Sequence, residues 1–226
     1  MIRTDIEKRV EEFRTQLNPC DRYTSFDYCY NYFQRKDDLI KDIEKSSLTL
    51  GFYLASWGMF RGSSFLLQKS IKHFEPIIHY ISMMDDSVWK IDVDTYSEQN
   101  IETIINIYHE IKKLLIVGKN ADLTLVTKVL LGVFGFIPAF DNYFTTTFRV
   151  IADGQCGFRK VNKKSLAFIK KFYEVNREAI DSLSSQIYTI DFSTGRKTNI
   201  NYSKAKIIDM YGFTSGLPAS GDDETD

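Results

Sequence analysis

The segment 122–148, DLTLVTKVLLGVFGFIPAFDNYFTTTF, constrains the fold of this chain more than any other stretch. It is apolar on nearly every side, and a helix that is hydrophobic all round is normally buried. Two charged residues lie inside it, Lys128 and, shortly after Pro138, Asp141. We therefore predict a central buried helix that carries a lysine into the core. Asp122 is its expected N-cap, and Pro138 is expected in the first turn of the next helix.

Hydrophobic periodicity predicts a mainly α fold of roughly eight helices with a small C-terminal β-hairpin. We expect one globular helical domain over residues 1–216 and an acidic, disordered tail over 217–226. The 17 Phe and 13 Tyr residues are expected to fill much of the core. Helices are predicted over 2–17, 37–45, 163–183 and 203–211, with a short helix from Ser25 or Asp27. Two helical pieces are predicted within 48–67, followed by a helix to 83 that restarts at Pro76. A further helix is predicted to begin at a Thr95-x-x-Glu98 capping box. Alternation over 186–192 and 197–202 predicts the hairpin.

The overall charge and the cysteines restrict the class of protein. With 29 basic and 30 acidic side chains, the formal net charge is −1, which argues against a dedicated nucleic-acid binder. One local basic segment, 159–164, could contact phosphates or begin a solvated helix. The three cysteines show no disulfide or zinc spacing, so reduced thiols and a cytoplasmic location are expected. Charge, glycine and proline interrupt the longest apolar window, so we interpret it as core, with no membrane partner.

Lys128 and Asp141 are the first candidate site. A buried lysine must pair or lose its proton, and a lysine with a lowered pKa can act as a nucleophile or base. The alternative is a structural ion pair, or a lysine that reaches the surface.

The pattern of a lysine on a buried helix followed by Pro-x-x-Asp resembles that of the helix-hairpin-helix DNA glycosylases, over about 25 residues. The resemblance implies an all-helical enzyme that flips a base out of the duplex and attacks its glycosidic bond. It would make Lys128 the nucleophile and Asp141 the residue that activates the attacking group. The glycine-rich hairpin of that family is missing before the lysine, where only Gly118 lies nearby, and the interval from lysine to aspartate is shorter.

A second candidate is the segment Trp57-Gly58-Met59-Phe60-Arg61-Gly62-Ser63-Ser64. An arginine between glycines, with two hydroxyls at an expected helix start, could bind a phosphate or carboxylate. Arg61, Ser63 and Ser64 are therefore the predicted anion-binding residues. The alternative is a corner between two helices, with a serine as the cap and Arg61 in an ion pair.

No motif predicts a metal or a cofactor. The three histidines lack a ligand spacing, and the acidic residues of 85–94 lack the EF-hand register, so we expect a solvated loop there. No Ser/His/Asp signature, HExxH or dinucleotide fingerprint is present.

Two functional hypotheses remain. The leading one is a cytosolic helical protein that binds a small anionic ligand or a partner protein. The alternative is an enzyme that processes bases in nucleic acid, with Lys128 and Asp141 as catalytic residues. An open pocket lined by both residues and rimmed by basic residues would favour the enzyme. If Lys128 lies on the surface, or is closed off in a pair with Asp141, the enzyme hypothesis fails. The substrate, the biological process and the oligomeric state cannot be predicted from these residues.

Overall fold

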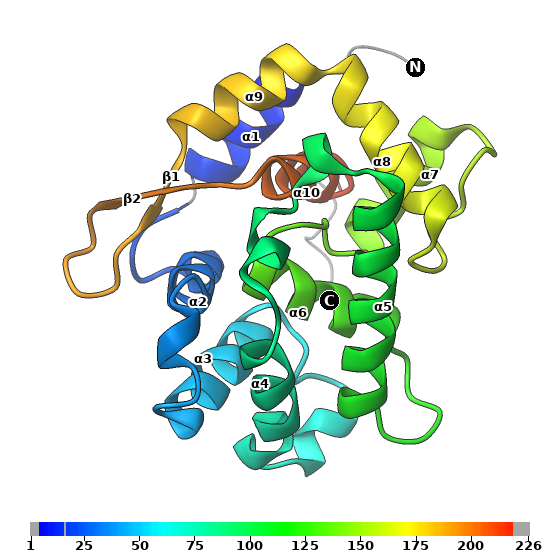
Figure 1. Ribbon diagram of the computed structural model, residues 1–226. Helices are drawn as coiled ribbons and strands as arrows, with labels where there is room; N and C mark the ends of the chain where they lie inside the picture. Colours follow the sequence, from blue (N-terminus) through cyan, green and yellow to red (C-terminus); the bar gives the residue numbers. More distant parts are fainter. Residues whose placement is uncertain (1–4, 16, 219–226) are drawn as a thin grey trace, which may run out of the picture.

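The computed structural model describes residues 5–15 and 17–218, and most of them are helical (Figure 1). The α-helices are α1 (Ile6–Thr15), α2 (Ser25–Phe33), α3 (Ile43–Ser56), α4 (Glu75–Ser82), α5 (Glu98–Leu115), α6 (Leu123–Phe134), α7 (Asn142–Ala152), α8 (Lys163–Val175), α9 (Arg177–Gln186) and α10 (Lys204–Ser215). Short 3₁₀ helices are η1 (Arg22–Thr24), η2 (Lys36–Asp38), η3 (Phe65–Gln68), η4 (Ile71–Phe74), η5 (Asp86–Lys90) and η6 (Val93–Thr95). Strands β1 (Tyr188–Ile190) and β2 (Lys197–Asn201) pair antiparallel. The predicted mainly α class with a C-terminal hairpin is confirmed.

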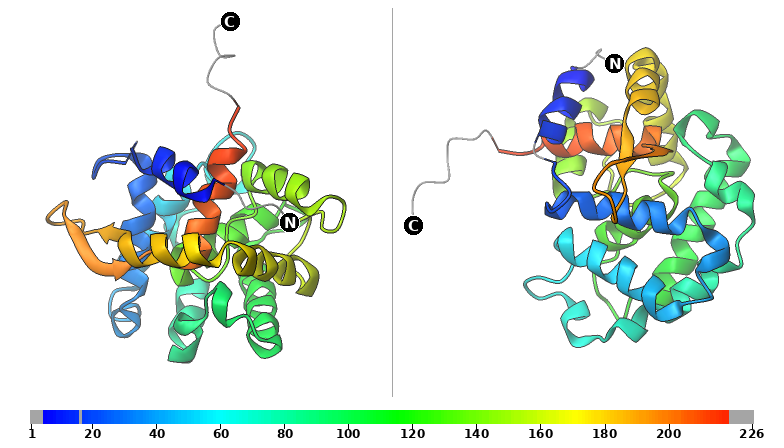
Figure 2. Two further views of the ribbon diagram at one scale, coloured as in Figure 1. Left: turned by 90° about the horizontal axis from the view of Figure 1, so that it is seen from above. Right: turned by 90° about the vertical axis from the view of Figure 1, so that its left-hand side faces the viewer.

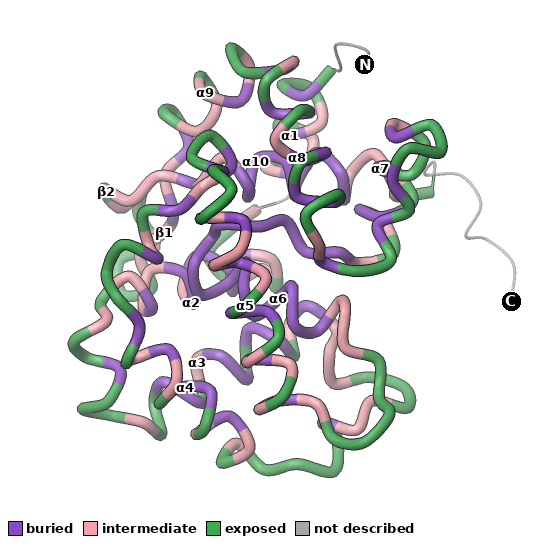
Figure 3. Tube along the Cα trace, turned by 45° about the vertical axis from the view of Figure 1, so that its right-hand side comes forward, coloured by how far each residue is buried: buried purple, intermediate pink, exposed green. Residues whose placement is uncertain are grey.

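Helix α6 lies at the centre of the molecule, between α2 and α3 on one side and α5 on the other (Figure 1). Helix α10 lies above it and packs against α7, α9 and α1, so the first and last described helices lie side by side (Figure 2). The buried segments gather around α6 and α10, while the outer helices expose one face (Figure 3). The core that positions the candidate residues is therefore built around two helices that are buried nearly all round.

Helix α6 has the all-round burial that its sequence predicts, since each residue from Leu125 to Phe134 is buried. Gly135 ends the helix in the left-handed conformation, with φ of 71°. Gly132 allows the ring of Tyr53 to lie directly on the helix backbone, and the Tyr53 hydroxyl donates to the carbonyl of Lys128 at 3.1 Å. Helix α3 is thereby fixed against the turn that holds Lys128.

We expect Gly132→Ala to lower the free energy of unfolding by about 1–3 kcal/mol, because overpacking a dense core has that cost. A Cβ at Gly132 would overlap the buried ring of Tyr53. Urea denaturation measures the effect. Gly157→Ala is the matched control, since a Cβ there meets only Arg159, at 3.8 Å. Equal stability of the two variants would contradict the close packing described.

Several predicted helix boundaries are wrong. The range 37–45 is not one helix: η2 ends at Asp38, and α3 begins at Ile43 behind its N-cap, Asp42. The range 163–183 is divided at Asn176, whose side chain donates to the carbonyl of Phe172 at 2.9 Å. The predicted bend at Gly58–Gly62 and the restart at Pro76 are both observed, the latter in the first turn of α4.

Two predicted caps and one predicted helix start are also wrong. Thr95 belongs to the capping box of η6, and Ser97 caps α5. Asp122 precedes α6 without capping it, because its carboxylate accepts from Tyr108 and pairs with Lys112 at 2.9 Å. Pro138 lies outside any helix, and Asp141 is the residue that caps α7. Residues 219–226 of the predicted tail lie outside the part of the chain that the structure describes.

The hairpin docks on α2 through two side chains one helical turn apart. Asp27 accepts the amide of Ile190 at 2.8 Å and the hydroxyl of Tyr202 at 2.5 Å. Asn31 donates to the carbonyl of Ile190 at 2.9 Å and accepts from Thr189 at 2.6 Å. The amide and the carbonyl of Ile190 in β1 are thus bonded by side chains of α2 rather than by a third strand.

Burial raises the pKa of Asp27 to about 6, against the opposing hydrogen bonds from Tyr202 and Ile190. A carboxyl with a raised pKa in the folded state holds its proton longer there than in the unfolded chain. Its contribution to stability is therefore greatest below the unfolded pKa and is lost as pH rises toward 6. Between pH 4 and pH 6, we expect the free energy of unfolding to fall less in Asp27→Asn than in the parent chain. Urea titrations across this range measure it, and an unchanged slope would contradict the assignment.

Candidate functional site

The structure brings Lys128 and Asp141 together. The Lys128 side chain is 3% exposed, and its Nζ lies 3.2 Å from Oδ2 of Asp141, which is 13% exposed. The other carboxylate oxygen of Asp141 accepts the amide of Phe144 at 3.0 Å and so caps α7. Helix α6 positions the lysine in mid-helix, and the N-terminus of α7 positions the aspartate. The result is a closed ion pair, which is the arrangement that favours a structural role.

A second lysine–aspartate pair lies close by, on α10. Nζ of Lys206 is 2.8 Å from Oδ2 of Asp209, and both side chains are at most 4% exposed. Oδ1 of Asp209 accepts the amide of Ala139 at 3.0 Å, in the connection between α6 and α7. This pair therefore links α10 to the segment that carries Asp141.

Trp57, at the end of α3, joins the two pairs. Nζ of Lys128 and Nζ of Lys206 each lie 4.7 Å from the centroid of its ring. The two ammonium groups are consequently no farther apart than twice that distance. Trp57 is 7% exposed, and its indole N–H is buried without a hydrogen-bond partner among residues 5–15 and 17–218. We call Trp57, the two lysines and the two aspartates the Trp57 cluster.

The Trp57 cluster holds more hydrogen-bond donors than its acceptors use. Each ammonium group carries three N–H donors, and an indole carries one. Lys128 and Lys206 each make one hydrogen bond, to their own aspartate. The attraction of the ammonium groups to the ring partly compensates for their burial. The unused donors nevertheless mark a place where further acceptor atoms would be stabilising, since unpaired buried polar groups are costly.

Aromatic side chains surround the cluster. Phe13 and Phe26 line Lys206, with ring centroids 5.3 and 4.5 Å from its Nζ. Tyr23 and Phe213 pack against Trp57, at centroid distances of 5.0 and 6.0 Å. Tyr23 is only partly buried, whereas Phe213 is 6% exposed. Tyr23 is therefore the ring of this group nearest to solvent.

The predicted anion-binding residues lie outside the cluster. Arg61 and Ser63 are exposed, and the Ser64 hydroxyl donates to the carbonyl of Met59 at 2.6 Å. Ser64 caps η3, a 3₁₀ helix of four residues, so the full α-helix start expected here does not form. The same sequence motif nevertheless contributes to a buried charged site, because its first residue is Trp57.

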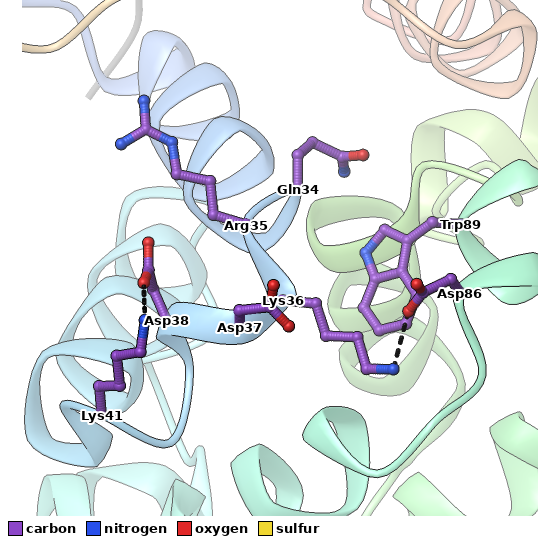
Figure 4. Close-up of a pocket in the computed structure, with 8 residues that line it drawn as sticks. All are labelled: Gln34, Arg35, Lys36, Asp37, Asp38, Lys41, Asp86 and Trp89. Atoms are coloured by element: carbon purple, nitrogen blue, oxygen red, sulfur yellow. Dashed lines mark hydrogen bonds and ion pairs between the residues drawn. The ribbon is translucent and has the colours of Figure 1, made fainter.

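Surface pockets elsewhere are lined by charges, some of which are paired. The pocket in Figure 4, of about 490 Å³, lies between residues 34–41 and the segment of Asp86 and Trp89. Lys36 pairs there with Asp86, Lys41 pairs with Asp38, and Arg35 points away from Trp89 (Figure 4). A second pocket, of about 300 Å³, includes part of the predicted basic segment.

The basic segment itself is partly engaged. Lys163 pairs with Glu102 at 2.5 Å and with Glu98 at 3.6 Å. Arg159, Lys160 and Lys164 are exposed. The charges that remain available are thus those at the start of the segment and Lys164.

The remaining sequence candidates lie away from the cluster. His73 bonds the carbonyl of Leu115 at 2.9 Å. The loop expected to be solvated contains Asp92, which accepts three backbone amides and whose pKa burial raises to about 6. Among residues 5–15 and 17–218, no group of three or more His, Cys, Asp or Glu residues could hold a metal ion. None of the helices in these ranges is long and apolar enough to cross a membrane.

Sequence reasoning missed Lys206 and Asp209. The signal was the one that identified Lys128: a charge inside an otherwise apolar helical run, here AKIIDMYGF. It was overlooked because the i, i+3 spacing of the pair is also typical of exposed helix faces.

Comparison with known proteins found no matching family model, no similar curated protein and no similar solved structure.

Proposed function

We propose that this chain is a cytosolic binding protein that recognises a small anionic ligand at the Trp57 cluster. The observation that carries the proposal is the surplus of buried donors, two ammonium groups and an unpartnered indole N–H around one ring. Buried charges are costly, and a protein that keeps two buried ammonium groups against one side chain has a site of chemical interest.

An anion would meet three favourable features there. The lysines supply charge in a region of low dielectric, where attraction is stronger than in water. The N-terminus of α7 favours negative charge, as its capping by Asp141 already shows. Displacement of the partly buried Tyr23 would give a ligand access to Trp57.

Tryptophan fluorescence tests the proposal, because the chain has two tryptophans. Trp89→Phe leaves Trp57 as the reporter. Phosphate, acetate and benzoate are titrated at constant ionic strength against chloride. We expect a saturable change in emission from at least one oxyanion and a rise in melting temperature. An anion at 100 times its dissociation constant should add about 2.7 kcal/mol to the free energy of unfolding.

Two variants control this measurement. In Trp57→Phe the reporter is Trp89, which lies in the separate pocket of Figure 4, so emission should not change. Lys128→Met should weaken binding. No response from any oxyanion beyond that of chloride would contradict the proposal.

The glycosylase-like enzyme implied by the resemblance is the second candidate, and the closed pair of Lys128 and Asp141 argues against it. Lys128 and Asp141, the two residues that the glycosylase resemblance designates, lie 3.2 Å apart although they come from different helices. The rings of Tyr23 and Trp57 beside them could stack on a flipped base. In this alternative, once the pair opens, Asp141 takes a proton from the Lys128 ammonium group and the neutral amine bonds the glycosidic carbon. The bond from that carbon to the base breaks, and the base leaves with the bonding electrons and takes up a proton from water.

This alternative is tested with duplex DNA that contains damaged bases. Base release, strand cleavage and borohydride trapping of a covalent lysine adduct are measured, with Lys128→Ala and Asp141→Asn as inactive controls. Trapping that depends on Lys128 would support the enzyme. The absence of both activity and DNA binding at low salt would exclude it.

A further inference from the structure

We infer that the anionic ligand is an aromatic carboxylate, and that Asp141 and Tyr23 occupy its place in the structure described. The inference rests on the proposed binding function and names the class of ligand. It follows from the exposure and the bonding of Asp141 and Tyr23. Both are more exposed than the other members of the site, Asp141 bonds Lys128, and Tyr23 packs against Trp57.

Asp141 occupies the place of the ligand's carboxylate. Its side chain is 13% exposed, whereas that of Asp209 is 4% exposed, so it is the more accessible of the two acids. Only Oδ2 bonds the lysine, while Oδ1 is held separately by the amide of Phe144. The cap of α7 and the bond to the lysine therefore use different oxygens of this carboxylate. An incoming carboxylate would compete only with Oδ2 for the lysine.

Tyr23 occupies the place of the ligand's ring. Its ring packs against Phe13, Trp57 and Phe213 at centroid distances of 5.4, 5.0 and 5.8 Å. Its hydroxyl bonds only the side chain of its neighbour, Arg22, at 3.1 Å. No hydrogen bond therefore ties Tyr23 to the core. It lies on η1, a 3₁₀ helix of three residues, and another aromatic ring can replace its contacts with Trp57.

The two places belong to one ligand because both border Trp57. Nζ of Lys128, which bonds Asp141, is 4.7 Å from the ring that Tyr23 packs against. A benzoate-like molecule carries both groups, a ring for the place of Tyr23 and a carboxylate for that of Asp141. The spare N–H donors of Lys128 would bond the carboxylate, and the ring would pack on the indole.

The test uses Asp141→Asn and Tyr23→Ala with benzoate, cyclohexanecarboxylate, acetate and phosphate. Asparagine is as good an N-cap as aspartate, so Asp141→Asn retains the cap and removes the competing charge. We expect it to bind benzoate about tenfold more tightly than the parent chain, a change of about 1.4 kcal/mol. Tyr23→Ala should bind benzoate more tightly and acetate unchanged, because only the ring gains space. Benzoate should exceed cyclohexanecarboxylate in every variant.

Asp122→Asn is the matched control, since Asp122 also precedes a helix and pairs with a lysine, away from Trp57. It should bind benzoate as the parent does. The inference is overturned if the parent binds oxyanions but Asp141→Asn and Tyr23→Ala leave the affinity for benzoate unchanged or lower it, or if phosphate binds best. If neither the parent nor either variant binds any oxyanion, the proposed function itself fails. Either variant alone supports the inference should the other not fold.

Discussion

Replacing Lys206 with methionine is expected to lower the free energy of unfolding by about 3–5 kcal/mol, which is the cost of leaving a buried charge without its partner. Asp209, at 4% exposure, would keep its bond from the amide of Ala139 but lose its counter-charge. The attraction of the ammonium group to Trp57, Phe13 and Phe26 would be lost as well. Urea denaturation at pH 7 measures the change.

The double variant Lys206→Met, Asp209→Asn separates the charge from the packing. Removing both members of a buried pair is often neutral, since the desolvation cost of both ions disappears. We therefore expect the double variant to recover much of the stability that the single variant loses. If Lys206→Met alone costs less than about 1 kcal/mol, a value typical of exposed pairs, Lys206 is not buried as described.

Asp92→Ala is expected to destabilise the fold by about 2–4 kcal/mol, because several buried amides lose their acceptor at once. The carboxylate accepts the amides of Val93 and Lys204 at 2.7 Å each and that of Ala205 at 3.0 Å. One side chain thus bonds the first turns of both η6 and α10. Thermal and urea unfolding measure the loss.

Asp85→Ala is the matched control. Asp85 also caps a 3₁₀ helix, η5, but it accepts only from Ser87, at 2.8 Å, and it is exposed. Its removal should cost about 0.5–1 kcal/mol, the lower part of the range for caps. Equal losses in the two variants would show that Asp92 does not connect two helices.

Strong periodicity made the fold class predictable from the sequence. The all-apolar run of α6 and the alternation around Gly195 correspond to the central helix and the hairpin. The errors concern carboxylates that had several possible partners. Asp122 was expected to cap α6, but Tyr108 and Lys112 occupy its carboxylate. Such competition is decided by residues distant in sequence, which a local pattern does not contain.

The candidate site was predictable in part. The mismatch of a lysine with its apolar surroundings identified Lys128, and proximity in sequence suggested Asp141. The role of Trp57 could not be predicted, because it depends on how the end of α3 packs against α6 and α10. Arg61 was singled out from the same motif, yet its side chain lies on the surface. The motif marked the right segment, and tertiary packing selected a different residue within it.

The docking of the hairpin on α2 affects when this part of the chain can fold during its synthesis. Asp27 and Asn31 bond residues 189, 190 and 202, and α1 packs against α9 and α10. Helix α2 thus finds partners that are translated 158 to 175 residues later. Contacts so distant in sequence slow folding, and the exposed apolar faces of α1 and α2 must wait for them. We expect nascent chains that end before residue 187 to need a chaperone, and these contacts to form only after the hairpin has been translated.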